Sequence, residues 1–221
     1  MRRRSGLEIP ETLEDACDPA TMALIVYDMQ AGVLGQLPDG GAEAIARVSR
    51  VLTAARAGGY PVFFTRHMSL PVRLMGTAQL RTAMAWQQVD SPEKVQSWFL
   101  RGTPGFEIVA DLAPRADEAV FDKITMSAFD STFLGLALRD CGLHAIAIAG
   151  IAMEIGIEPT VRQATDNGFA ALVIEDACGF GNRDARDRSM ATLGFLGEAV
   201  VTNVTGFCAA LASQADHHVS R

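Results

Sequence analysis

The chain alternates short, continuous apolar runs with longer stretches in which apolar residues recur at helical spacing. The apolar runs cover residues 22–28, 61–65, 118–123, 144–149, 170–174 and 199–202. The helical patterns cover residues 42–56, 131–141, 154–166 and 186–196. A continuous apolar run is typical of a strand buried on both faces, and regular alternation with helices favours parallel strands. The pattern therefore predicts an α/β fold, a Rossmann-like three-layer α/β/α sandwich with a six-stranded, mainly parallel sheet.

Length and composition favour one globular domain and a small-molecule ligand. The chain has 221 residues, of which 49% are hydrophobic and 20% charged, so a disordered, collagen-like or coiled-coil chain is excluded. The 26 acidic residues outnumber the 19 basic ones and give a net charge of -7. That charge gives no support for binding a phosphate backbone, so we expect no nucleic-acid partner.

The cysteines and the terminal segments predict a cytoplasmic protein. The four cysteines are scattered singly, without the spacing of a disulfide framework or a zinc site. The basic start is followed by a polar, acidic stretch over residues 5–20, where a secretory signal would be apolar. No uncharged stretch is long enough to read as a membrane span. We therefore expect a cytoplasmic location and no membrane contact.

The alternating pattern is interrupted over residues 68–115, which contain a helical pattern near residues 78–88. We divide the chain into an N-terminal extension (1–20), a single domain that carries this insertion (21–212) and a flexible tail (213–221). An excursion of this length over the strand ends forms a lid that shapes a pocket, an oligomer surface, or both at once, and the sequence favours neither role over the other.

Polar residues at the ends of the apolar runs are the first candidates for chemistry, because ligands of such folds bind at the carboxyl ends of the strands. These positions are Asp28, His67, Lys123 and the turn at residues 150–156. Lysine is scarce, since 17 of the 19 basic residues are arginine. A carboxylate at the end of a buried strand must be paired, cap a helix or act as an acid or base. If Lys123 lies beside Asp28, their opposite charges hold both in place.

Four segments, taken in order, resemble one family. They are LIVYDMQ around Asp28, GTPG at residues 102–105, DKITMSAF at 122–129 and GIAMEIGIEPTVRQATDNGF at 150–169. Together they look like the isochorismatase-like hydrolase superfamily, which includes nicotinamidases, N-carbamoylsarcosine amidohydrolases and isochorismatases. The resemblance implies the sandwich fold already expected, hydrolase activity on a small molecule, and a homo-oligomer, either a dimer or a tetramer.

In the cysteine hydrolases of that superfamily, an aspartate, a lysine and a nucleophilic cysteine form the catalytic triad. The resemblance assigns the aspartate to Asp28 and the lysine to Lys123, and it places Gly156 at the cysteine position. It also implies a cis peptide bond between Ile151 and Ala152. The backbone N–H groups of Ala152 and Gly156 would then face the pocket as an oxyanion hole.

Glycine has no side chain, so a covalent acyl-enzyme cannot form at Gly156. Cys178 does not stand on the required turn, and we expect it to be a buried hydrophobic residue. The resemblance extends to the isochorismatase branch, which also has glycine at this position and hydrolyses a vinyl ether without a covalent intermediate. In that branch's mechanism Asp28 would donate the proton and water would be the nucleophile. Lys123 would interact with the charge of the substrate or of the transition state.

The chain departs from true isochorismatases at two positions. Those enzymes have tyrosine where Ala152 stands and glutamine where His67 stands. We therefore do not assign isochorismate as the substrate. Amidases of the nicotinamidase type carry an Asp/His metal site after the second strand, and only His67 is present here, so we expect neither a metal nor a cofactor.

Seven residues near these positions are candidates for substrate binding. They are Ile151, Ala152, Met153, Glu154, His67, Phe129 and Trp86. Met153 stands where many relatives have threonine. Glu154 either complements the helix dipole or points into the pocket and activates a water molecule. Phe129 and Trp86 either line an apolar pocket or pack in the core.

The leading hypothesis is a cofactor-independent hydrolase that cleaves a C–O or C–N bond of a small molecule, with Asp28 as acid/base and Lys123 as its charged partner. A second hypothesis is a catalytically inactive binding or scaffold protein that has kept the fold. A third is an amidohydrolase whose nucleophilic cysteine was replaced at Gly156, naturally or by engineering.

Overall fold

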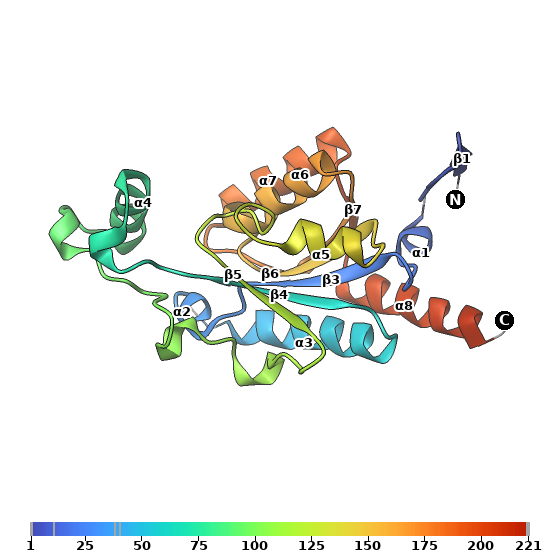
Figure 1. Ribbon diagram of the computed structural model, residues 1–221, viewed down its shortest axis with the longest axis horizontal. Helices are drawn as coiled ribbons and strands as arrows, with labels where there is room; N and C mark the ends of the chain where they lie inside the picture. The colour runs from blue at the N-terminus through green and yellow to red at the C-terminus, as the bar shows by residue number, and fades with distance from the viewer. Residues whose placement is uncertain (1, 11, 38, 40, 220–221) are drawn as a thin grey trace.

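The computed structural model describes residues 2–10, 12–37, 39 and 41–219, and its centre is a parallel sheet (Figure 1). Within these residues the sheet has six strands in the order β5-β4-β3-β6-β7-β8, and every neighbouring pair is parallel. The strands are β3 (Met22–Tyr27), β4 (Val62–His67), β5 (Ala119–Lys123), β6 (Ala145–Ile151), β7 (Ala170–Gly179) and β8 (Val200–Thr202). The predicted sheet is confirmed, and each predicted apolar run carries one strand.

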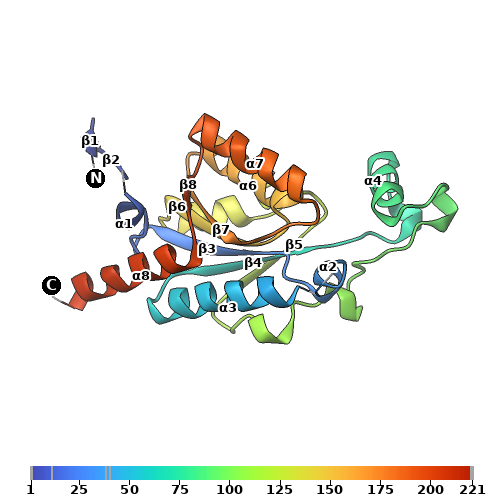
Figure 2. The same cartoon turned by 180° about the vertical axis from the view of Figure 1, so that it is seen from behind.

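Helices cover both faces of this sheet (Figures 1 and 2). One face carries α3 (Ala42–Ala57) and α8 (Val204–Val219), and the other carries α5 (Leu134–Asp140), α6 (Glu158–Asp166) and α7 (Arg183–Leu196). Side chains of β3 alternate between the two cores, because successive residues of a strand point to opposite faces. Leu24 and Val26 belong to the core beneath α3 and α8, and Ile25 and Tyr27 to the core beneath α5, α6 and α7.

The order of the strands reverses between β3 and β6. From β3 the chain adds β4 and β5 on one side, and it then returns to place β6, β7 and β8 on the other. A crevice opens at such a reversal, outside the carboxyl ends of the strands. Asp28 follows β3 and the turn at residues 150–156 follows β6, so the fold brings both to this crevice.

Most of the insertion (residues 68–115) extends away from the sandwich. Its helix α4 (Thr77–Gln87) stands clear of the sheet in Figures 1 and 2, close to where residues 78–88 predicted a helix. Four short 3-10 turns accompany it: η1 (Val72–Leu74), η2 (Pro92–Lys94), η3 (Pro104–Phe106) and η4 (Ala110–Leu112). The turn η3 packs against α2 (Ala31–Leu34), which follows Asp28, and this contact brings the returning chain back to the strand ends.

The terminal segments contain structure that was not predicted. The N-terminal extension contains an antiparallel pair, β1 (Arg2–Arg4) with β2 (Leu7–Ile9), and the short α1 (Leu13–Ala16), none of which was predicted. Helix α8 continues to Val219 and so includes most of the predicted flexible tail, whose flexibility stays a prediction; residues 220–221 lie outside the described residues. Among the described residues, none of the helices has the length and apolar character to cross a membrane.

Candidate active site

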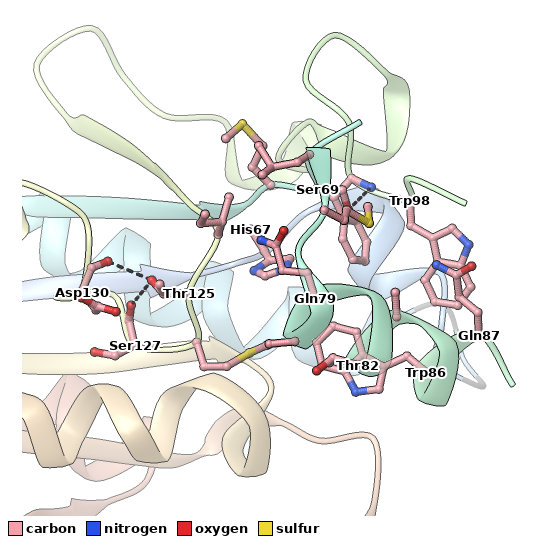
Figure 3. Close-up of a pocket in the computed structure, with 18 of the residues that line it drawn as sticks. His67, Ser69, Gln79, Thr82, Trp86, Gln87, Trp98, Thr125, Ser127 and Asp130 are labelled. Carbon is pink, nitrogen blue, oxygen red and sulfur yellow. Dashed lines mark hydrogen bonds between the residues drawn. The ribbon is translucent and has the colours of Figure 1, made fainter. Parts of the chain in front are cut away.

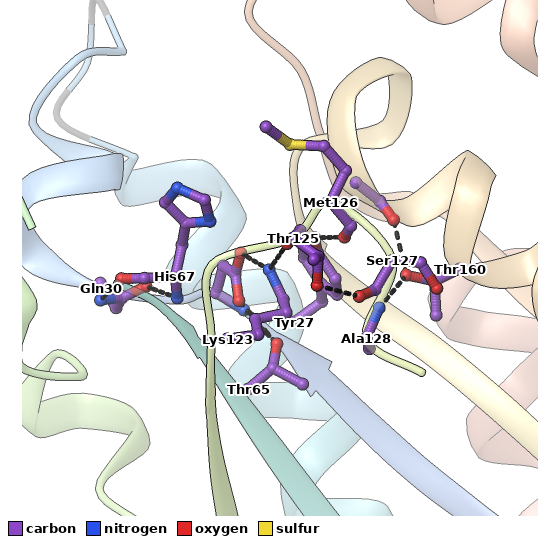
Figure 4. Close-up of polar contacts among 12 residues, drawn as sticks. Tyr27, Gln30, Thr65, His67, Lys123, Thr125, Met126, Ser127, Ala128 and Thr160 are labelled. Carbon is purple, nitrogen blue, oxygen red and sulfur yellow. Dashed lines mark hydrogen bonds and ion pairs between the residues drawn. The ribbon is translucent and has the colours of Figure 1, made fainter. Parts of the chain in front are cut away.

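Asp28 stands directly after β3 in the left-handed backbone region, with φ 47°. Non-glycine residues rarely adopt that region, and here the geometry turns the chain from the sheet toward α2. Both carboxylate oxygens of Asp28 accept a hydrogen bond: Oδ1 from Thr65 Oγ1 at 2.6 Å and Oδ2 from Lys123 Nζ at 2.6 Å (Figure 4). Asp28 is only 4% exposed, so its negative charge depends on these two donors.

Lys123 ends β5, and its side chain is fully buried. The ammonium binds Asp28 and also donates to the carbonyl oxygen of Thr125 at 3.3 Å. It lies 4.3 Å from the centre of the Tyr27 ring, within cation–π distance. Burial lowers the pKa of Lys123, and the adjacent carboxylate opposes that shift. The predicted proximity of Asp28 and Lys123 is therefore confirmed.

Tyr27 occupies the space that a side chain at residue 156 would need. A β-carbon built on Gly156 would lie 2.7 Å from Tyr27 Cε1, and closer still to Cζ and the hydroxyl oxygen. The hydroxyl donates a hydrogen bond to the carbonyl oxygen of Met126. Burial, together with the charge of Asp28, raises the pKa of Tyr27 well above its ordinary value, so the phenol stays protonated. Only glycine fits at residue 156 while Tyr27 keeps this position.

The turn after β6 confirms one expectation and contradicts another. The peptide bond between Ile151 and Ala152 is cis, as the resemblance implied. The N–H of Gly156, however, donates to the carbonyl oxygen of Ala152 at 3.0 Å within the π-helical turn η5 (Met153–Ile157). The prediction that this N–H serves an oxyanion hole is wrong for the described structure, because the turn itself uses the donor.

A cavity of about 550 Å³ opens beside Asp28. Six of the predicted site residues line it: Asp28, Gly156, Ile151, Ala152, His67 and Trp86. Lys123 is fully buried and bound to Asp28, and it is not among the residues that line the cavity. Tyr27 and Phe99 also line the cavity, and neither was predicted. The fold thus gathers most of the predicted residues around one space.

Three predicted substrate-binding residues lie elsewhere. Met153 and Phe129 belong to the core under α5, α6 and α7, because their apolar side chains pack between the sheet and these helices. Glu154 does not point into the cavity. Its Oε1 accepts hydrogen bonds from the backbone N–H groups of Gly181 and Asn182, each at 2.8 Å, and so holds the loop after β7.

His67 lies between the cavity and the returning insertion. Its backbone N–H donates to Gln30 Oε1 at 2.6 Å, and Gln30 Nε2 donates back to its carbonyl oxygen at 2.9 Å. Its ring makes edge contacts with Trp86 and Phe99. Burial, reinforced by the positive charge of Lys123, lowers the pKa of His67 to about 4. The imidazole is therefore neutral at pH 7.

Several polar residues around this site were not predicted, among them Thr65, Gln30, Tyr27 and Thr160. The Thr160 hydroxyl donates to the carbonyl oxygen of Gly156 at 2.6 Å and accepts from the N–H of Ala128. Thr65 lies inside a predicted strand and Gln30 follows Asp28 by two residues, so position next to a strand end was the available signal. Tyr27 directly precedes Asp28 and so had the same positional signal, whereas Thr160 had none.

The buried cysteine near the site is not a competing nucleophile. Cys178 lies in the core, and burial raises the pKa of its thiol to about 12, so the reactive thiolate is not populated at neutral pH. No group of three or more histidine, cysteine, aspartate or glutamate side chains within the described ranges is arranged to hold a metal ion. The titratable side chains that remain as candidates in the cavity wall are therefore Asp28 and its neighbour His67.

Known proteins are similar to this chain over most of its length. A model of the isochorismatase domain matches residues 22–205. The isochorismatase family protein YecD of Escherichia coli O157:H7 is 32% identical over 176 residues, covering 77% of this chain and 86% of YecD. The ureidoacrylate amidohydrolase RutB of Methylobacterium radiotolerans is 30% identical over 190 residues, covering 79% of this chain and 74% of RutB. A solved isochorismatase family protein from Desulfovibrio vulgaris has the same fold, with a TM-score of 0.73 at 23% identity, covering 87% of this chain and 98% of that one.

Proposed function

The chain belongs to the isochorismatase family of hydrolases, and we propose that it cleaves a C–N or C–O bond of a small molecule with a water molecule activated by Asp28. The observation that carries the proposal is the buried Asp28–Lys123 ion pair in the wall of the cavity. A buried carboxylate that faces a cavity and has a matched cation is a typical proton-transfer site.

The contacts of Asp28 favour a base over the proton donor that the isochorismatase resemblance implies. Thr65 and Lys123 each donate to one carboxylate oxygen, and charge-assisted hydrogen bonds of this kind stabilise the ionised form. A protonated Asp28 would weaken the ion pair and leave the ammonium of Lys123 buried without a counter-charge. We therefore place Asp28 at the start of the reaction as a carboxylate.

The proposed reaction needs one proton to move twice. Asp28 takes a proton from a water molecule in the cavity while the water oxygen bonds to the electrophilic carbon of the substrate. The bond from that carbon to the leaving nitrogen or oxygen then breaks, and Asp28 returns the proton to the leaving atom. Lys123 holds the carboxylate in place and balances its charge throughout. No bond forms between substrate and protein, and no co-reactant other than water is consumed.

Residue 156 supports a water nucleophile. The resemblance places the family's nucleophilic cysteine at this position, and here Gly156 has no side chain while Tyr27 fills the adjoining space. The similarity to a ureidoacrylate amidohydrolase favours a C–N bond among the possible targets. A vinyl ether, suggested by the glycine that this chain shares with the isochorismatase branch, would instead need Asp28 to start in its protonated form, because the enol-ether carbon must accept a proton before water can add.

The test is turnover of a panel of small amides, ureido compounds, esters and enol ethers. We expect wild type to hydrolyse at least one of them and Asp28→Asn to lower kcat by about 10²–10⁴-fold, the usual contribution of a general acid or base. Asp122→Asn is the matched control, because Asp122 pairs with Arg66 and Arg101 outside the cavity. Undiminished turnover by Asp28→Asn contradicts the proposal, and an inactive wild type favours a binding or scaffold protein.

A further inference from the structure

We propose that the substrate is a molecule in two parts without a negative charge, with the reacting group beside Asp28 and an apolar, ring-bearing part in a second cavity beneath α4. This inference rests on the proposed function for the identity of the reacting end. The second cavity, the wall that it shares with the first and the charges around both carry the argument.

The second cavity has a volume of about 520 Å³ and lies between α4 and the loops that follow β4 and β5 (Figure 3). Its apolar wall is formed by aromatic and sulfur-containing side chains, among them Trp86, Trp98, Phe99, Met68 and Met75. Small-molecule sites in proteins have volumes of about 300–1,000 Å³ and are lined mainly by such side chains. The space can therefore hold a ring of substrate size.

The two cavities adjoin each other. His67, Trp86, Phe99 and Met126 line both, and the His67 ring contacts Trp86 and Phe99 edge to face, with ring centres 6.3 and 5.7 Å apart. A molecule that reaches Asp28 in the first cavity thus has a second chamber directly across this aromatic boundary. Flat aromatic edges and faces suit an apolar ring better than a carboxylate.

Charge decides which molecules can enter. Among the described residues that line the two cavities there is no lysine and no arginine. The charged side chains in the two walls are Asp28 and Asp130, and the nearby Lys123 is fully buried and bound to Asp28. With its pKa lowered to about 4, His67 is neutral. A carboxylate in either chamber would lose its hydration without gaining a cationic partner, so the site disfavours anions.

Amide groups supply the polar side of the second chamber. Gln79 and Gln163 line it, and Gln87 uses its amide to hold the chain at Gln96, with Nε2 donating to the Gln96 carbonyl oxygen at 2.8 Å and Oε1 accepting from the Gln96 N–H at 2.8 Å. Neutral donors and acceptors of this kind can pair with a hydroxyl, ether or carbonyl group of an uncharged ligand. The lining therefore matches a partly aromatic molecule that carries no negative charge.

The test is equilibrium binding of two probes that cannot be hydrolysed. Benzylacetone is an uncharged ketone, and hydrocinnamate has the same skeleton with a carboxylate oxygen in place of the methyl group. We expect wild type to bind benzylacetone at least about tenfold more tightly, measured by calorimetry. Gln36→Arg adds a cation to the cavity beside Asp28, where the carboxylate would lie, and should narrow that preference about fivefold or more by tightening hydrocinnamate. Gln214→Arg, a matched control on α8 at the opposite end of the molecule, should leave the preference as in wild type.

A third variant locates the ring. Ala83 lines the second chamber, and Ala83→Phe should fill it and weaken benzylacetone about tenfold or more. The inference is overturned if hydrocinnamate binds wild type as tightly as the ketone, if Ala83→Phe leaves ketone binding unchanged, or if the ketone does not bind at millimolar concentration. Neither probe reacts, so loss of the proposed catalytic role of Asp28 and loss of this inference are separate results.

Discussion

Adding a single methyl group at Gly156 should destabilise the folded protein, because Tyr27 already fills the space. The new β-carbon would lie 2.7 Å from Tyr27 Cε1, and closer to two further atoms of the phenol, so the ring must move. Overpacking of this kind costs about 1–3 kcal/mol. Moving the phenol also breaks its hydrogen bond to the Met126 carbonyl oxygen, which adds roughly 1–3 kcal/mol. We therefore expect Gly156→Ala to lower the free energy of unfolding by roughly 2–6 kcal/mol.

The assay is urea unfolding of four proteins in a double-mutant cycle. Leucine at position 27 lacks the three phenol atoms that would meet the new methyl group. In a Tyr27→Leu background, Gly156→Ala should therefore cost less than about 1 kcal/mol, and the coupling energy between the two sites should exceed about 1 kcal/mol. Gly194→Ala is the matched control, because nothing lies within 4 Å of the β-carbon that it would add in α7.

The reasoning is refuted if Gly156→Ala costs no more than Gly194→Ala. It is also refuted if the cost is the same in the wild-type and Tyr27→Leu backgrounds, since the clash would then lie elsewhere. Both results concern stability and require no substrate.

Three further predictions follow from the buried groups. Lys123→Met should lower the free energy of unfolding, measured in urea, by about 3–5 kcal/mol, because it leaves the Asp28 carboxylate buried without a counter-charge. The control is Lys94→Met, which breaks the exposed ion pair with Asp90 and should cost under about 1 kcal/mol. Equal losses of stability in the two variants would contradict this prediction. His67 has a pKa of about 4 when folded against 6.5 ordinarily, so the unfolded chain binds the extra proton in this range. Stability should fall by about 3 kcal/mol as pH drops from 6.5 to 4, and His67→Gln should lose that part of the slope; an unchanged slope would show that His67 is not buried in its neutral form. Iodoacetamide at pH 8 should label the exposed Cys141 and leave Cys178 unlabelled until urea unfolds the chain. Rapid labelling of Cys178 in the folded protein would contradict this prediction.

The sheet was predictable because its strands are buried on both faces. A run such as residues 22–27 must be apolar at every position to satisfy two cores, and that requirement is visible without coordinates. The pair of Asp28 and Lys123 was predictable for a related reason, since parallel strands end at one edge of the sheet and bring their following residues together. In both cases the topology alone fixes the outcome.

Other features depend on contacts between segments that the sequence does not connect. A tyrosine in an apolar run is typical of a core residue, and nothing near Tyr27 in the chain indicates that its hydroxyl reaches Gly156 and Met126. Glu154 was misplaced because its partners, the N–H groups of Gly181 and Asn182, come from another loop. Predictions at these positions require the packing of the turn after β6, which local patterns do not specify.

A single-turnover reaction in heavy-oxygen water tests the central claim most directly. A substrate that wild type hydrolyses is mixed with excess enzyme, and the masses of the product and of the intact protein are measured by mass spectrometry. If water activated by Asp28 is the nucleophile, the heavy oxygen appears in the product and the protein keeps its mass throughout. Heavy oxygen in the Asp28 carboxylate, or a protein adduct during turnover, would show that a side chain attacks the substrate and would contradict the account.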